Sequence, residues 1–111
     1  MAPRSRVLTE FELLVTLAVI SLGDAAYPLA IGNAIEQRTR RKAARGAVLI
    51  TLERLEDKGL LTSWYGDPTP VRGGRAKRLF RAKPAALEAV RASLRRIDAM
   101  VNGLESVLKL E

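Results

Sequence analysis

Apolar residues recur at helical spacing in three successive stretches of the chain, at residues 10–22, 28–38 and 46–58. Thr9 and Glu12 have the spacing of a capping box at the start of the first stretch, and Gly23 follows its end. Pro28 opens the second stretch, where proline is favoured, and Gly59 follows the third, where glycine commonly ends a helix. We therefore predict three helices joined by short connectors.

The first predicted helix is apolar around most of its circumference. Its residues form one apolar face along Phe11, Leu14, Val15 and Ala18 and a second along Leu13, Leu17 and Ile20. A helix of this kind must be covered on both sides. One side can pack on the domain's own core, and residues 84–111 are the only spare element that could cover the other.

Two later stretches, residues 60–65 and 76–83, are rich in β-branched, aromatic and alternating residues, which is typical of strands. The sequence between them contains Gly-Asp-Pro-Thr-Pro at residues 66–70 and a Gly-Gly pair at residues 73–74, both of which require turns. We therefore predict a two-stranded hairpin after the third helix.

The last stretch, residues 84–111, begins with a proline at a helix start and has apolar residues at alternating gaps of three and four. This is the pattern of a coiled-coil seam, and we expect one continuous helix in which Gly103 is a weak point but not a stop. The natural partner of the seam is the same helix of a second copy, and the alternative is an amphipathic helix folded over its own domain. The predicted interface of a homodimer comprises Leu13, Leu17, Ile20, Leu87, Val90, Leu94, Ile97, Val101, Leu104 and Leu108.

Together these elements predict a mainly α fold with a small two-stranded β-wing. Residues 1–83 would form a winged helix-turn-helix DNA-binding domain, and residues 84–111 a long C-terminal dimerisation helix. In this arrangement the third helix enters the major groove of DNA and the hairpin lies beside it as the wing.

The composition narrows the classes of partner and chemistry. The chain has 111 residues, a formal net charge of +7 and a pI near 10.6, which favours a polyanion, either nucleic acid or an acidic membrane surface. It contains no cysteine and no histidine, which excludes disulfides, the usual zinc, haem and iron–sulfur ligand sets, and nucleophilic catalysis that depends on histidine. We expect neither a cofactor nor an enzyme.

Eleven of the nineteen basic residues fall into two groups that no acid interrupts. The first group leads into the third helix and the second lies in the hairpin: Arg38, Arg40, Arg41, Lys42 and Arg45, then Arg72, Arg75, Lys77, Arg78, Arg81 and Lys83. In a winged helix the two groups flank the helix that reads DNA, where phosphate contacts position the protein and base contacts specify the sequence. A basic face that serves only solubility is the alternative.

The predicted DNA contacts follow from that arrangement. Phosphates would be held by Arg40, Arg41, Lys42 and Arg45, beside the free N–H groups at the start of the third helix. The outward residues of that helix would face the bases, namely Ala47, Ile50, Thr51 and Arg54. The wing would contribute Arg72, Gly74, Arg75 and Lys77.

The first apolar run could pass for an export signal, because Arg4 and Arg6 precede it. However, Glu10 and Glu12 lie against the run, where an export signal would avoid acids, and the run is too short to span a bilayer. The hairpin cations also lie in turns and strands, not along one amphipathic helix. We therefore expect a cytoplasmic chain without a membrane partner.

These motifs, in this order, resemble the PadR-like winged-helix transcriptional regulators, in particular the short members with a single C-terminal helix. The similar segments are EFELLV at residues 10–15, LGDAAY at 22–27, Gly46 with TLERLEDKGLL at 51–61, and GGRAKR at 73–78. The resemblance implies a homodimeric repressor whose last helix packs against the partner's first and last helices. It also implies release from DNA by a small aromatic or amphipathic effector.

The chain departs from the family pattern at several positions. Leu49 stands where the family usually has a tyrosine, and Ala44 stands where a small polar cap is usual, which should weaken the start of the third helix by about 1 kcal/mol. Residues 84–111 contain no tryptophan, so the aromatic sandwich that some members use for planar drugs cannot form there. The alternative function is a winged-helix protein that binds nucleic acid without sequence preference, either architectural DNA or RNA.

Overall fold

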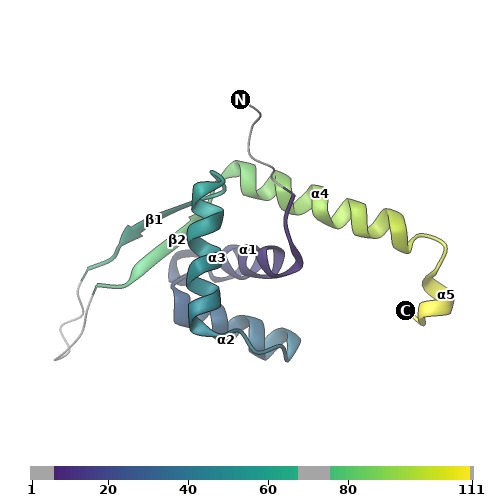
Figure 1. The fold of residues 1–111 in the computed structure, drawn as a ribbon, viewed down its shortest axis with the longest axis horizontal. Helices are drawn as coiled ribbons and strands as arrows, with labels where there is room; N and C mark the ends of the chain where they lie inside the picture. Colours follow the sequence, from purple (N-terminus) through teal and green to yellow (C-terminus); the bar gives the residue numbers. More distant parts are fainter. Residues whose placement is uncertain (1–6, 68–75, 111) are drawn as a thin grey trace.

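A computed structural model of the chain describes residues 7–67 and 76–110 (Figure 1). Its elements in chain order are α1 (Glu10–Leu22), the 3-10 helix η1 (Gly23–Ala25), α2 (Pro28–Thr39), α3 (Arg45–Asp57), β1 (Leu61–Tyr65), β2 (Arg78–Ala82), α4 (Pro84–Val101) and α5 (Glu105–Leu108). The three predicted helices and two predicted strands are present, with bounds shifted by no more than two residues. The prediction of a mainly α fold with a two-stranded wing is confirmed.

The helices α1, α2 and α3 enclose the core together with the base of the wing. Val15 of α1, Ile31 of α2 and Leu52 of α3 are fully buried, as is Phe80 of β2. α1 contacts α2, α3, β2 and α4, which makes it the central element of the domain. This explains its apolar circumference, because the helix is covered by neighbours on several sides within one chain.

The wing is an antiparallel pair in which Leu61 lies opposite Ala82 and Tyr65 lies opposite Arg78. The Phe80 N–H donates to the Ala26 carbonyl at 2.9 Å, which fastens the middle of β2 to the loop before α2. Because Leu61 and Phe80 are buried, the base of the wing belongs to the core of the domain. Its strands then lead away from the helices, on the opposite side from α4 (Figure 1).

A buried ion pair joins the start of α1 to the end of α3. The predicted capping box is present, with the Thr9 hydroxyl accepting from the Glu12 N–H at 3.2 Å and the Glu12 carboxylate accepting from the Thr9 N–H at 2.9 Å. The Lys58 ammonium lies 2.9 Å from both oxygens of the same carboxylate. Burial raises the pKa of Glu12, but the hydrogen bond from Thr9 and the Lys58 charge outweigh it and hold that pKa below its ordinary value.

The C-terminal segment is not one continuous helix, so that prediction is wrong. α4 ends at Val101, and Gly103 adopts a left-handed conformation with φ +89° before the short helix α5 begins. The Gly103 N–H donates to the Glu105 carboxylate at 2.8 Å and the Leu104 N–H to the Val101 carbonyl, so the break satisfies backbone groups that a helix would have used. Leu104 and Leu108 therefore lie outside α4.

The predicted dimer residues fall into different environments within the single chain. Leu13 and Val90 are each only 7% exposed and belong to the chain's own core, so little of either side chain is left for contact with a second copy. Leu17 and Val101 are half-buried, while the remaining six are exposed: Ile20, Leu87, Leu94, Ile97, Leu104 and Leu108. α4 thus covers its own domain with the face that carries Val90 and leaves an apolar face uncovered.

Candidate nucleic-acid interface

Helical phase divides α3 into a buried and an outward face. Val48, Thr51, Leu52 and Leu55 recur at intervals of three and four and are buried. Thr51 is only 5% exposed, so the prediction that it faces outward is wrong. Ala47, Ile50 and Arg54 are exposed on the other face, and their contact with bases stays a prediction.

Leu49 is the outward residue that the sequence reading left out of the site. Its side chain is 38% exposed and lies on the same side of α3 as Gly46, one helical turn away. The signal was present in the helical phase, because a residue between the buried Val48 and the exposed Ile50 lies at the edge of the outward face. From the sequence, Leu49 was noted only as a departure from the tyrosine that is usual in the PadR-like regulators.

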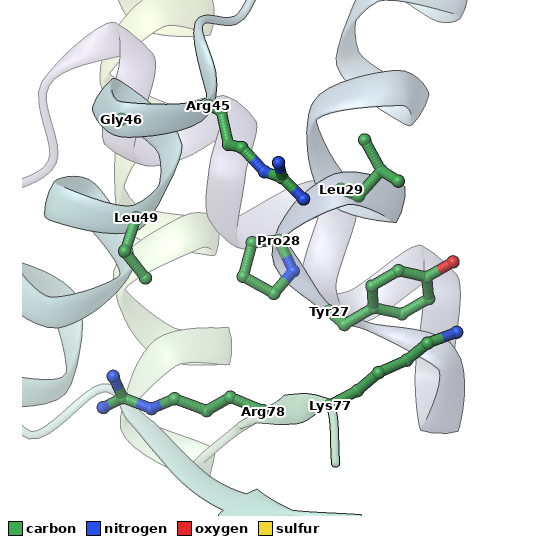
Figure 2. Close-up of a pocket in the computed structure, with 8 residues that line it drawn as sticks. All are labelled: Tyr27, Pro28, Leu29, Arg45, Gly46, Leu49, Lys77 and Arg78. Atoms are coloured by element: carbon green, nitrogen blue, oxygen red, sulfur yellow. The ribbon is translucent and has the colours of Figure 1, made fainter. Parts of the chain in front are cut away.

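A hollow of about 520 Å³ lies between the starts of α2, α3 and β2, and we call it the α3–wing hollow. It is lined by Tyr27, Pro28, Leu29, Arg45, Gly46, Leu49, Lys77 and Arg78 (Figure 2). Much of the lining is apolar, and Arg45 and Lys77 enter it from opposite elements. The Lys77 ammonium lies 4.1 Å from the centroid of the Tyr27 ring, a cation–π contact that holds this charge at the base of the wing.

The start of α3 carries unneutralised positive charge. Ala44 occupies the N-cap position and makes no side-chain hydrogen bond, as its residue type predicted, so the first N–H groups of the helix lack a cap. Arg40, Lys42 and Arg45 are exposed and form no ion pair with any residue in the described part of the chain. This end of α3 is therefore electrostatically suited to an anion.

Arg41 differs from its neighbours because it folds back on α1. Its guanidinium lies 3.0 Å from the Glu10 carboxylate and 4.9 Å from the centroid of the Phe11 ring. Both charged side chains of this pair are largely exposed, and exposed pairs contribute only about 0–1 kcal/mol. A phosphate could therefore replace Glu10 as the partner of Arg41 at small cost.

The structure separates the hairpin cations that the sequence grouped together. Three predicted wing residues, Arg72, Gly74 and Arg75, lie outside the described residues. Lys77 is exposed, whereas the guanidinium of Arg78 pairs with acids of α3 and that of Arg81 with Asp24. Of the two described wing cations that line the α3–wing hollow, Lys77 is thus the one without an ion pair among the described residues.

Residues 7–67 and 76–110 contain no group of three or more acidic, cysteine or histidine side chains able to hold a metal ion. None of the helices in this part of the chain has the length and apolar character needed to cross a membrane. Cations without an ion pair in the described part of the chain lie beside the exposed side of α3 and the α3–wing hollow.

Comparison with solved structures identifies the fold. A PadR-family transcription regulator from Clostridium difficile superposes with a TM-score of 0.69 over 90% of this chain and 98% of its own, at 17% identity. This chain has the PadR winged-helix fold. A PadR-family regulator from Eggerthella lenta gives a TM-score of 0.69 over 92% and 88% of the two chains at 19% identity. A transcriptional regulator from Clostridium thermocellum gives 0.70 over 86% and 89% at 18% identity.

No protein-family model matches the sequence, and no curated protein matches it significantly. These three solved structures are each below 20% identical to the chain, so what they share with it is the arrangement of the helices and the wing. The resemblance drawn from the sequence motifs is confirmed at the level of fold. Function has to be argued from the surface of this chain itself.

Proposed function

We propose that this chain is a sequence-specific DNA-binding transcriptional regulator. The observation that carries the proposal is the start of α3, where Arg40, Lys42 and Arg45 have no acidic partner among the described residues. Lys77 adds a further cation across the α3–wing hollow. Cations without an acidic partner around an exposed helix favour DNA binding, because neutralisation of phosphates supplies a large share of the affinity of proteins for a duplex.

The arrangement suggests a division of roles along α3. Arg40, Lys42, Arg45 and Lys77 would contact phosphates and fix the helix in the major groove. Ala47, Leu49 and Ile50 offer apolar contact to thymine methyl groups, and Arg54 offers hydrogen bonds to a base edge or a phosphate. In this proposal Leu49, and not Thr51, is one of the residues of α3 that face the bases.

We propose that the regulator acts as a homodimer through the uncovered face of α4. Leu94 and Ile97 are 46% and 53% exposed, and Leu87 shares a hollow of about 220 Å³ with Ile20 of α1. A second copy can supply matching apolar surface to α4 and α1 at the same time. Two copies related by a two-fold axis would place two α3 helices on half-sites about one helical turn, or 34 Å, apart.

We further propose that the dimer is a cytoplasmic repressor whose bound state blocks transcription. The resemblance to PadR regulators suggests release by a small aromatic or amphipathic molecule. The one tryptophan of the chain is Trp64 of β1, so an effector held between α4 helices would meet aliphatic side chains such as Leu94 and Ile97.

A second candidate is a winged-helix protein that binds nucleic acid without sequence preference. The observation that favours it is the scarcity of hydrogen-bonding groups at the start of α3, where Ala47, Leu49 and Ile50 are apolar. Apolar contacts discriminate bases less than bidentate hydrogen bonds do. The two candidate functions differ in how well an unrelated duplex should compete with the protein's own operator: poorly for a sequence-specific regulator, and equally well for a non-specific binder.

The test is a fluorescence-anisotropy titration at about 150 mM salt, with the duplex upstream of this protein's own gene as the labelled probe. Unrelated duplex and folded RNA serve as competitors, and the Arg45→Gln variant is measured in parallel. A regulator of its own locus prefers the probe by about a thousandfold or more. Arg45→Gln should weaken binding to every duplex alike and lower the salt slope by about 0.9 per subunit, or about 1.8 for the proposed dimer, because each subunit loses one phosphate contact.

Equal and steeply salt-dependent binding to both duplexes would support the second candidate, a winged-helix protein that binds nucleic acid without sequence preference. Preference for folded RNA over both duplexes would contradict the regulator. An unchanged salt slope in Arg45→Gln would show that Arg45 does not contact a phosphate.

A further inference from the structure

Arg78 opens β2, yet its side chain turns back to the C-terminal half of α3. Its Nη2 donates to Glu56 Oε1 at 2.8 Å, and its Nη1 lies 3.5 Å from Glu53 Oε1. Its Nε donates to the Ser63 hydroxyl at 3.3 Å, and that hydroxyl donates to Glu56 Oε2 at 2.8 Å. One guanidinium therefore joins α3, β1 and β2, and we call these four residues the wing clamp.

The wing clamp is more sheltered than the other arginine–carboxylate pairs of the described chain. The side chains of Arg78 and Glu56 are 27% and 31% exposed, whereas those of Arg81 and Asp24 are 61% and 94% exposed. The Arg78 guanidinium also lies 5.0 Å from the centroid of the buried Phe80 ring. Charge-assisted hydrogen bonds in a partly desolvated site are stronger and less screened by salt than exposed ones.

Arg78 and Lys77 are neighbours in the sequence but point in opposite directions (Figure 2). Lys77 reaches toward Tyr27, whereas Arg78 is directed to α3. While the wing clamp holds, Nε and Nη2 of Arg78 donate to Ser63 and Glu56, and Nη1 faces the Glu53 carboxylate. Arg78 is therefore poorly placed to act as one more phosphate contact among the hairpin cations.

We propose that Arg78 is a positioning residue that fixes the wing against α3 and makes no contact with DNA. The inference rests on the proposed function, in which α3 and the wing grip the same duplex. The angle between α3 and the wing should then be fixed before DNA binds. If the wing became ordered only on binding, the entropy lost would lower the affinity for DNA. Glu56 is the residue of α3 that holds Arg78. In this role its carboxylate supports DNA binding indirectly, because it fixes the position of the wing.

The effect of removing the acid distinguishes this role from a phosphate contact. If Arg78 binds a phosphate, Arg78→Gln weakens DNA binding, and Glu56→Gln strengthens it by freeing Arg78 and deleting a negative charge. If the wing clamp positions the wing, both variants weaken binding, each by about tenfold as an order of magnitude. The double variant should then be no weaker than the weaker single variant, because both changes break one interaction.

Asp57→Asn is the matched control. Asp57 is the next residue of α3, is exposed, and makes no ion pair or side-chain hydrogen bond with the described residues. It removes the same charge from the same end of the helix without touching the wing clamp. Asp57→Asn should leave DNA affinity unchanged or raise it slightly, in contrast to Glu56→Gln.

Amide hydrogen exchange of the free protein, followed by NMR, tests the wing clamp without DNA. Arg78→Gln and Glu56→Gln should both accelerate exchange in β1 and β2 by about tenfold relative to Asp57→Asn, while α1 and α2 stay protected. Unchanged exchange in the strands would overturn the inference, as would tighter DNA binding by Glu56→Gln. If the unaltered protein binds no duplex, the proposed function fails, and the exchange data still decide whether the wing clamp exists.

Discussion

Glu12 shows how one side chain can serve both a helix end and the core. Its carboxylate accepts from the Thr9 N–H and pairs with Lys58, although its side chain is only 2% exposed. Burying an unpaired carboxylate would be costly, so each of these partners is needed for the charge to be tolerated. The pair also connects the start of α1 to the end of α3 and thereby helps to orient the helix proposed to read DNA.

Replacing Glu12 should therefore destabilise the domain, mainly because Lys58 is left without a partner in a sheltered site. We expect Glu12→Gln to lower the free energy of unfolding by about 2–4 kcal/mol in urea denaturation at pH 7. Glu10→Gln is the control, since Glu10 forms an exposed pair with Arg41 and should have almost no effect. Equal losses in the two variants would contradict this role for Glu12.

The same pair predicts how stability depends on pH. Because the pKa of Glu12 is lower in the folded chain than its ordinary value of 4.5, protonation favours the unfolded state. The contribution is present above that ordinary value and is lost as the pH falls through the lowered folded value. As the pH falls below 4.5, the stability of Glu12→Gln should decrease less steeply than that of the unaltered protein.

At the level of single residues the sequence predicted some features of the site and missed others. The capping box was readable because its spacing is local. Thr51 faces the core and not outward, because Val48, Leu52 and Leu55 fix a helical phase that buries it. The partners of Arg78 could not be predicted, since Glu56 and Arg78 meet only when β2 folds back beside α3.

At the level of elements, the sequence predicted where helices and strands form better than where the last helix ends. The capping box, Pro28 and the turn residues place α1, α2, α3 and the two strands close to their observed bounds. The apolar seam passes through residues 102–104 without a change of spacing, so periodicity alone gave no sign of a break. The positive φ of Gly103 ends the helical path there.

The uncovered face of α4 predicts self-association. Sedimentation equilibrium at micromolar concentration should give a dimer, and the double variant Leu94→Glu/Ile97→Glu should give a folded monomer, because both side chains are exposed in the single chain. Leu29→Glu is the control, since Leu29 is also 48% exposed but lies in the α3–wing hollow. A monomeric unaltered protein would contradict the proposed homodimer.

At the level of the whole molecule, two kinds of surface are kept apart. The wing and α4 extend to opposite sides of the helices α1 to α3 (Figure 1), and the whole molecule measures 56 × 39 × 21 Å. Unpaired cations gather at the start of α3, whereas exposed apolar residues gather on α4 and α5. This separation would allow a dimer to form through one surface while the other engages nucleic acid.

The central claim is that the exposed start of α3 and the base of the wing bind duplex DNA. It is tested most directly by titrating ¹⁵N-labelled protein with a duplex and following the backbone amide signals by NMR. We expect the largest shifts at Arg45, Ala47, Ile50 and Lys77, with little change at Ile97 of α4. Shifts confined to α4 and α5, with α3 unaffected, would contradict it.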